Sequence, residues 1–179
     1  MVKFATVMAA AATLTTVDAI GNTLLLLCEA PGLRAQVLAD PSLVDSLVEE
    51  SVRWESPVAN TSRVLAEPVC LGQVPLAAGD RVVMAWGSAN RDRAVFADGD
   101  VPRLDRDHGL HLGWGRGPHE CPGRHLARVA LAVVVEEVLA AVPDYEVVGP
   151  LPTRGYGALR GPLALPVEWS VQDSPEGSA

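Results

Sequence analysis

Residues 111–128 combine a glycine-rich loop with a single cysteine, a combination that suits metal ligation. The glycines at positions 113, 115 and 117 allow tight turns and let a bulky partner approach the backbone closely. Cys121 ends this loop and precedes a stretch that predicts a helix. Free N–H groups and the positive end of the helix dipole converge at a helix N-terminus, where they favour the thiolate, the form that binds metal. The pattern therefore predicts a loop that presents one axial thiolate ligand.

Two other interpretations of this stretch stay open at the level of residue types. An isolated cysteine is most often a small buried hydrophobic residue. All four histidines of the chain also lie near Cys121 in the sequence, at His108, His111, His119 and His125, which raises the hypothesis of zinc. Zinc sites usually show paired short spacings such as Cys-x-x-Cys, and the absence of such pairs here weighs against zinc.

Three long stretches without internal proline predict the helices that position the loop. Residues 2–30 are rich in Ala, Leu and Thr and predict one long, mostly buried helix. Residues 41–54 predict a second helix, with Asp40 as its N-cap. Residues 126–142 are apolar and rich in alanine, which predicts a long buried helix after the cysteine. Pro122 suits the first turn of that helix, where its missing N–H would have no partner in any case.

The rest of the chain predicts short strands and turns. Within residues 57–89, the segments 58–64, 69–71 and 81–85 are expected to be strands. Residues 90–109 form a long irregular segment, and loops of this length are usually functional or disordered. Glycine-proline turns between residues 145 and 171 predict hairpins. The fold class is therefore mainly α with small β-sheets, an α+β arrangement.

Composition limits the function classes. The chain has 179 residues, of which 49% are hydrophobic and 20% are charged, a composition typical of a globular domain. Its net charge of −8 argues against a nucleic-acid partner, because phosphate contacts require a basic surface. Cys28, Cys70 and Cys121 make an odd number without framework spacing, which favours a reducing cytoplasm over a disulfide scaffold.

The N-terminus allows a second interpretation. Lys3, the apolar run 4–12 and the small residues that follow also fit a short secretory signal peptide. Polar residues interrupt the apolar run at Thr13, Thr15 and Asp18, so we expect no membrane span.

The ordered string Trp-Gly-x-Gly-x-His-x-Cys-x-Gly, followed by Leu-Ala-Arg, closely resembles the haem-binding signature of the cytochrome P-450 family. The resemblance implies that Cys121 is the proximal thiolate ligand of the iron of haem b. It also implies that His119 contacts a haem propionate and that Trp114 is the aromatic ring beside the thiolate, where the family has Phe more often. The glycines expected to line the cofactor are Gly115, Gly117 and Gly123.

The resemblance extends to residues outside the loop. Thr15 falls where the family has its oxygen-activating threonine, although the acid expected before it is Leu14. Arg63 resembles the arginine that pairs with a haem propionate. The segment Glu-Ser-Val-Arg resembles the Glu-x-x-Arg element of the family. The resemblance implies a buried structural network made of Glu50, Arg53 and Arg103.

Taken as a whole, the resemblance implies the C-terminal part of the cytochrome P-450 fold of bacterial type. We expect residues 1–172 to form this partial domain and residues 173–179 to be a disordered tail. The implied activity is that of a haem-thiolate monooxygenase, which inserts one oxygen of O2 into a small organic substrate with electrons from a ferredoxin-type donor. Because the resemblance starts inside the distal helix, we expect a truncated chain. The alternative is a non-catalytic haem-binding or partner-binding subunit, or half of a split enzyme that a second chain completes.

Overall fold

The structure, a computed structural model, describes residues 2–153 and 157–170. The predicted tail at residues 173–179 lies outside the described residues. The α-helices are α1 (Val2–Glu29), α2 (Pro31–Ala39), α3 (Val44–Glu55), α4 (Trp86–Ala89) and α5 (Arg124–Ala141). Short 3-10 helices are η1 (Pro41–Leu43), η2 (His108–Leu110) and η3 (Gly117–His119). The three long predicted helices are therefore confirmed, and the end of the first lies one residue before its predicted end.

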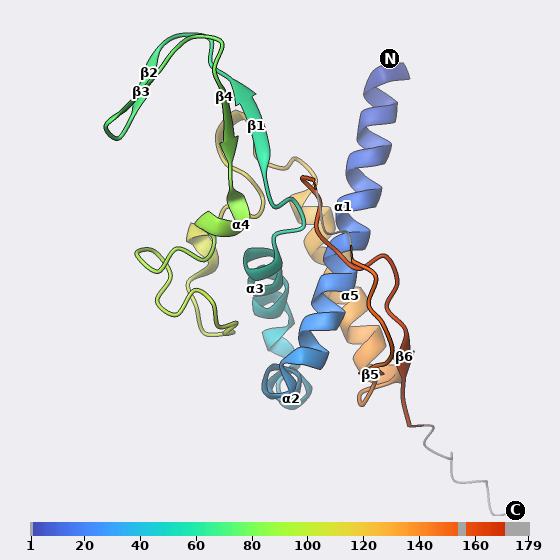
Figure 1. Cartoon of the computed structure of the whole chain (residues 1–179). Helices are drawn as coiled ribbons and strands as arrows, with labels where there is room; N and C mark the ends of the chain where they lie inside the picture. The colour runs from blue at the N-terminus through green and yellow to red at the C-terminus, as the bar shows by residue number, and fades with distance from the viewer. Residues whose placement is uncertain (1, 154–156, 171–179) are drawn as a thin grey trace, which may run out of the picture.

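The strands form antiparallel pairs. They are β1 (Thr61–Val64), β2 (Val69–Leu71), β3 (Val74–Leu76), β4 (Arg81–Met84), β5 (Glu146–Val147) and β6 (Val167–Glu168). Strand β1 pairs with β4, β2 with β3, and β5 with β6. The first two pairs build one long projecting hairpin (Figure 1), and the third joins the two ends of the C-terminal segment. The expectation of a mainly α chain with small sheets is confirmed.

Local chemistry explains the limits of helix α3. The Asp40 carboxylate accepts a hydrogen bond from the Ser42 N–H at 3.0 Å, which satisfies a donor at the start of the 3-10 turn that leads into the helix. The helix ends at Glu55, and the following residue, Ser56, has a left-handed φ of 47° that turns the chain away. The limits of α3 determine the direction in which the carboxylates of Glu49 and Glu50 point.

The core lies where helices α1, α3 and α5 cross (Figure 1). Each helix contributes fully buried aliphatic side chains, namely Leu26 and Leu27 from α1, Leu47 and Val48 from α3, and Leu131 and Val135 from α5. Burial of a Leu or Val side chain stabilises a fold by roughly 1.5–3 kcal/mol. This crossing therefore fixes the scaffold on which the cysteine loop rests.

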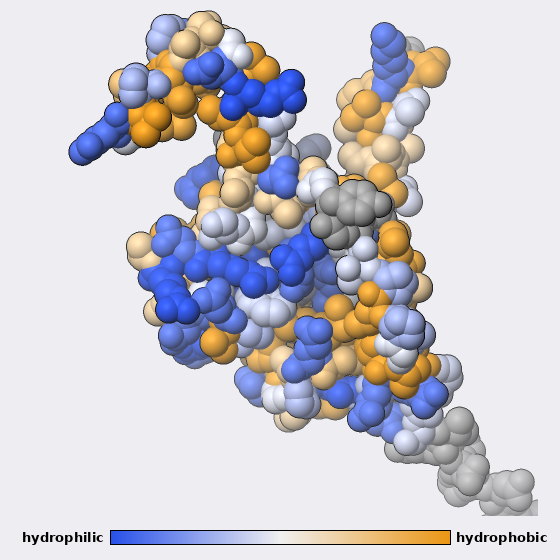
Figure 2. Space-filling model, viewed as in Figure 1, coloured by the Kyte–Doolittle hydropathy of each residue, from blue (hydrophilic) through white to orange (hydrophobic). Residues whose placement is uncertain are grey.

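The first half of α1 is exposed, which corrects the prediction of a mostly buried helix. The buried residues of α1 begin only at Asp18. Before that point the helix projects from the body (Figure 1), and hydrophobic surface lies along this projecting end (Figure 2). Phe4, Val7 and Met8 are among its exposed apolar side chains. Helix α1 is also long and apolar enough to cross a membrane by length and composition, a test that core helices and signal sequences pass as well.

The C-terminal helix α5 is likewise buried along one face only. Leu131, Val135 and Leu139 point into the core, whereas Leu126 and Val129 are exposed. The prediction of a buried helix is therefore correct for the face toward α3 and wrong for the opposite one. The periodicity of a helix that is apolar on all sides does not tell which face finds a partner.

A buried ion network joins α3 to the irregular segment 90–109. Glu50 and Arg53 are both fully buried, and two hydrogen bonds of 2.7 Å join their carboxylate and guanidinium. Arg53 also donates to the carbonyls of Asn90 and Gly99, at 2.6 and 2.9 Å. Burial raises the pKa of Glu50, but the hydrogen bonds and nearby arginine charges outweigh burial and hold this pKa below its ordinary value.

The second guanidinium of this network belongs to Arg106, which corrects the expectation for Arg103. Arg106 Nε lies 3.2 Å from Glu50 Oε1, and its other nitrogens donate to main-chain carbonyls of the irregular segment. Arg103 donates its backbone N–H to Glu50 at 2.8 Å, while its side chain turns to Asp105. Arg103 therefore takes part in the network through its main chain.

Replacement of Arg106 should destabilise the chain more than replacement of Arg103. Arg106→Ala leaves a buried carboxylate and several carbonyls short of donors, so we expect the free energy of unfolding to fall by on the order of 2 kcal/mol. Arg103→Ala removes only an exposed ion pair and should change stability little. Urea unfolding of both variants measures the difference. An equal loss in the two variants would contradict the assignment of Arg106.

Candidate functional site

The cysteine loop is held by its own backbone. The Gly115 N–H donates to the Leu112 carbonyl at 2.9 Å, and the Cys121 N–H donates to the Trp114 carbonyl at 2.8 Å. Gly115 has a φ of 72°, and a Cβ at this position would lie 3.2 Å from the His119 carbonyl oxygen. The loop therefore needs glycine here for both conformation and space, as the sequence predicts.

Cys121 itself is a free, partly exposed thiol just ahead of helix α5. It lies two residues before Gly123, the N-cap of the helix, and its carbonyl accepts a weak hydrogen bond of 3.4 Å from the Arg124 N–H. The Gly123 position is close to the thiol, since a Cβ there would lie 3.9 Å from Sγ. Cys121 therefore lies just before the N-terminus of α5, close to its predicted place, whereas Pro122 lies in the turn before the helix and not in its first turn as predicted.

The other two cysteines lie in different settings. Cys28 on α1 is partly buried and lies 3.7 Å from the Tyr145 carbonyl, and burial raises the pKa of its thiol. Cys70 is exposed on strand β2. Cys121 is thus the only cysteine of the chain that lies on a glycine-rich loop before a long helix.

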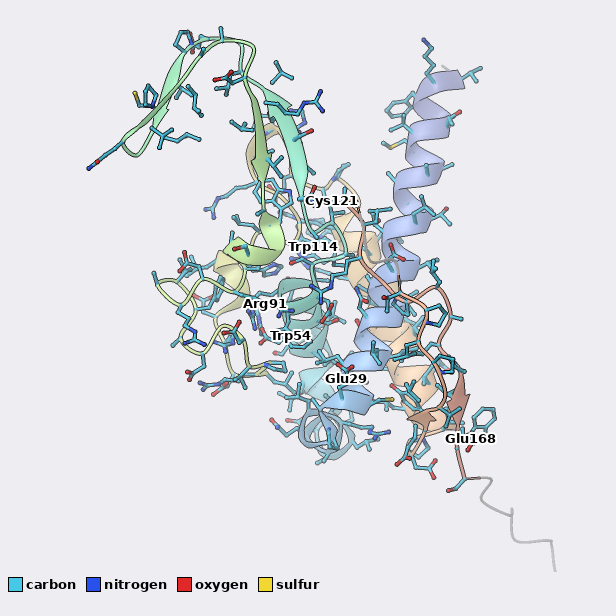
Figure 3. All side chains as sticks on the ribbon, viewed as in Figure 1. Glu29, Trp54, Arg91, Trp114, Cys121 and Glu168 are labelled. Carbon is cyan, nitrogen blue, oxygen red and sulfur yellow. The ribbon has the colours of Figure 1, made fainter. Side chains whose placement is uncertain are left out.

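The Trp114 side chain is fixed by contacts that the sequence did not suggest. Its indole Nε1 donates to Glu49 Oε2 at 3.0 Å, and the Arg128 guanidinium lies 5.4 Å from the ring centroid. Arg128 also forms an ion pair with the same Glu49 carboxylate. Trp114 and Cys121 lie above helix α3 in Figure 3, between strand β1 and helix α1 in this view.

Glu49 accepts a further hydrogen bond from His111. His111 Nε2 lies 2.8 Å from Glu49 Oε2, and its Nδ1 accepts the Gly113 N–H at 3.1 Å. Burial raises the pKa of Glu49, but the hydrogen bonds from His111, Arg128 and Trp114 outweigh burial and lower this pKa to about 2. The carboxylate is therefore ionised at neutral pH and joins α3, the cysteine loop and α5.

The residues expected to bind propionates are accessible. Arg63 on β1 is exposed, and its guanidinium donates to the carbonyl of the neighbouring Ser62 at 2.9 Å. His119 is exposed at the end of η3. Neither side chain forms an ion pair within the part of the chain that the structure describes, so both are available for an anionic group.

Thr15 lies on α1, in the part of the helix where burial begins. Its hydroxyl donates to the Ala11 carbonyl one turn earlier, at 2.7 Å. This bond is the ordinary back-bond of a helical threonine. Thr15 is not hydrogen-bonded to the cysteine loop in the described residues, so the two sides of the expected site are positioned by different contacts.

The ligands that the protein offers fit a metal that is already coordinated by a prosthetic group. Among residues 2–153 and 157–170, no three His, Cys, Asp or Glu side chains converge on a position that could hold a metal ion. A single, partly exposed thiol on a hydrogen-bonded loop instead suits one ligand position of a metal that is otherwise bound in a macrocycle. Such a donor set on a mainly α scaffold is typical of haem-thiolate proteins.

The chain belongs to the cytochrome P-450 family. The family model matches residues 33–141, a range that includes Arg63, Cys121 and the Glu50–Arg53 pair but not Thr15. Members of the family bind haem b, the cofactor that the cysteine motif implied.

Named relatives and a solved structure agree with this assignment. The chain is 40% identical over 86% of its length to the mycinamicin IV hydroxylase/epoxidase of Micromonospora griseorubida, of which it covers 40%. It is 37% identical over 73% of its length to the steroid C26-monooxygenase of Mycolicibacterium smegmatis, of which it covers 33%. The crystal structure of CYP109E1 from Bacillus megaterium with corticosterone matches with a TM-score of 0.91 at 31% identity, over 95% of this chain and 46% of that one. The chain thus spans less than half the length of these proteins.

Acid should destabilise the chain partly through Glu49. Because the pKa of Glu49 falls from 4.5 to about 2 on folding, its contribution is complete above pH 4.5 and is lost as the pH falls through 2. We expect Glu49→Gln to lower the free energy of unfolding at pH 7 by on the order of 3 kcal/mol and to flatten its decline between about pH 5 and pH 2. Urea unfolding at several pH values measures this. An unchanged acid profile would mean that Glu49 gains no charged partner on folding.

A methyl group at position 113 should disturb the loop more than one at position 117. A Cβ on Gly113 would lie 2.6 Å from Val52 Cγ1 and 2.9 Å from the Val52 carbonyl oxygen, so helix α3 or the loop must move. A Cβ on Gly117 meets nothing within 4 Å, and Gly117→Ala adds only the strain of a φ of 71°. Thermal unfolding should show the larger loss for Gly113→Ala, and the reverse order would contradict this packing.

Proposed function

We propose that this chain carries the haem-ligating part of a cytochrome P-450 monooxygenase, with Cys121 as the thiolate ligand. The observation that supports this most directly is the geometry of the loop: a free thiol before α5, on a backbone where Gly113 and Gly115 leave little room for a side chain. When bound through a thiolate, haem supplies oxygen activation, because the thiolate donates electron density that favours O–O cleavage.

The other side chains have distinct roles in this proposal. Arg63 and His119, both exposed, bind the propionates as charged or hydrogen-bonding partners. Trp114 shields the thiolate from water with its ring, and Gly115, Gly117 and Gly123 allow close approach of the cofactor. Thr15 holds a proton at its hydroxyl on the oxygen side. The neighbouring Leu14 cannot relay protons, so another group must supply them.

The partners in this proposal follow from the family. The substrate is a small organic molecule that receives one oxygen atom, and the electron donor is of the ferredoxin type. The candidates for docking an acidic donor near Cys121 are Arg116, Arg124 and Arg128, although Arg124 is paired with Glu120 and Arg128 with Glu49. The odd cysteine count supports a cytoplasmic location, the net charge of −8 argues against a nucleic-acid partner, and Thr13, Thr15 and Asp18 in the apolar N-terminal run argue against a membrane span.

A second candidate is a non-catalytic haem-binding or partner-binding subunit. The exposed apolar side chains along the first half of α1, including Phe4, Val7 and Leu14, favour it, because a contiguous apolar surface usually contacts another polypeptide. In that case a second chain contributes the surfaces that cover α1. A haem spectrum without turnover in the presence of substrate and donor would support this candidate.

Replacement of the ligand tests the leading proposal. The purified chain, loaded with haem, reduced and exposed to CO, should show a strongly red-shifted Soret band, and Cys121→Ser should abolish that band. Cys70→Ser is the matched control, because this thiol is exposed on β2 and far from the loop in sequence. A red-shifted band that survives in Cys121→Ser would rule out this cysteine as the ligand.

A further inference from the structure

Glu49 has more strong donors than a partly exposed helix carboxylate normally has. His111 Nε2, Trp114 Nε1 and Arg128 all contact its two oxygens, and its side chain is 16% exposed. Hydrogen bonds to a charged group are roughly twice as strong as hydrogen bonds between neutral groups. This cluster therefore fixes side chains from three separate segments against one another.

Two of these donors lie on either side of Cys121 in the chain. Trp114 lies seven residues before it and Arg128 seven residues after it, on the first turns of helix α5. The Trp114 main chain is also bonded to Cys121, because its carbonyl accepts the Cys121 N–H at 2.8 Å. Glu49 thus holds both ends of the segment that carries the thiol, from a helix that itself lies in the core.

The same carboxylate fixes the orientation of the indole. Its oxygen accepts the N–H at the edge of the ring, while the Arg128 guanidinium that it pairs with lies over the face of the ring. A ring held at both its edge and its face has one orientation. Loss of Glu49 would free the Trp114 edge and the Arg128 head in a single step.

His111 links the start of the cysteine loop to Glu49 through both of its ring nitrogens. Because His111 Nδ1 accepts the Gly113 N–H, the proton of a neutral ring lies on Nε2 and points to Glu49. Val52 packs directly against Gly113, so there is no space for a side chain at this position. The start of the loop is therefore bound to Glu49 through a side chain whose two nitrogens are both engaged.

We propose that Glu49 is a positioning residue for the cysteine loop. Through Trp114, His111 and Arg128, Glu49 sets the accessibility and orientation of the Cys121 thiol. The role as positioning residue for a haem ligand rests on the proposed function, whereas the control of the loop does not. Among the described residues, Glu49 is hydrogen-bonded to Trp114, His111 and Arg128 and not to Cys121, so its effect on the thiol must pass through these side chains.

The chain offers a closely matched control carboxylate. Glu55 lies on the same helix, is 14% exposed against 16% for Glu49, and pairs with Arg91 and Arg160. None of its partners lies in the cysteine loop. Glu49→Gln and Glu55→Gln therefore each replace a similarly exposed, arginine-paired carboxylate on α3, and only the first should change the thiol.

The test measures Cys121 directly, before any cofactor is added. In a Cys28→Ala, Cys70→Ala background, Cys121 is the only thiol, and its alkylation by iodoacetamide can be followed in the full chain. We expect Glu49→Gln to accelerate alkylation about tenfold, the equivalent of one lost charge-assisted hydrogen bond, and Glu55→Gln to leave the rate within about twofold. The indole N–H signal of Trp114, assigned with Trp114→Phe, should shift only in Glu49→Gln.

A double-mutant cycle separates positioning from general loosening. If Glu49 acts partly through the indole, Glu49→Gln should accelerate alkylation less in a Trp114→Phe background than in the parent. Trp114→Phe also tests the proposal if Glu49→Gln does not fold, because it removes one donor and keeps a ring. Alkylation unchanged in both Glu49→Gln and Trp114→Phe, or equal acceleration by Glu55→Gln, would overturn the proposal.

The haem-loaded chain separates this proposal from the assigned function. We expect Glu49→Gln to lose the red-shifted Soret band of the reduced CO complex about tenfold faster than the parent, with Glu55→Gln unchanged. If the parent shows no such band but alkylation still depends on Glu49, the haem function fails and the control of the loop stands. If the parent shows the band and Glu49→Gln changes neither alkylation nor the indole signal, the function stands and this proposal fails.

Discussion

Two adjacent carboxylates on helix α3 must remain charged in surroundings with little water, and the rest of the structure is arranged to satisfy them. A carboxylate removed from water is costly unless cations or hydrogen-bond donors replace its hydration. Glu50 is fully buried and forms an ion pair with Arg106 of the irregular segment. Glu49 accepts a hydrogen bond from Trp114 of the cysteine loop and forms an ion pair with Arg128 of helix α5. Because neighbouring helix positions point in different directions, the two carboxylates bind two different parts of the chain to one helix.

This arrangement explains how a loop without regular structure presents a thiol in a defined place. The loop rests on α3 through Glu49 and Val52, and it leads directly into α5, which packs on α3 through Leu131 and Val135. The ligand is thus fixed by the core crossing of the helices and by polar contacts above it. The contacts that hold the segment around Cys121 all come from residues that the structure describes.

The opposite side of the expected site is built differently. Thr15 lies on α1 where burial begins, and its hydroxyl is bonded within its own helix. The preceding apolar turns face solvent, as Figure 2 shows along the projecting end of the helix. The chain spans 40% of the mycinamicin hydroxylase/epoxidase that it resembles. Contacts with α3 and α5 therefore hold the thiolate side of the proposed site, whereas contacts within α1 alone hold the Thr15 hydroxyl on the oxygen side.

The sequence by itself determined the features that depend on short stretches of chain. The order of glycines around Cys121 predicted the loop and the family, because turns and close approach require particular residues at fixed spacing. Apolar composition, caps and prolines predicted the long helices and where they end, since these signals act within a few residues.

Only the tertiary structure decided which distant side chains meet. Arg103 and Arg106 are equally plausible partners of Glu50 in the sequence, and their distances from it along the chain hardly differ. The path of the irregular segment turns the Arg106 guanidinium inward and the Arg103 side chain toward Asp105. No local pattern marks Glu49, because its donors follow at least 62 residues later in the chain. Long-range pairing of charges depends on how helices and loops pack in space, and no local pattern of residues encodes it.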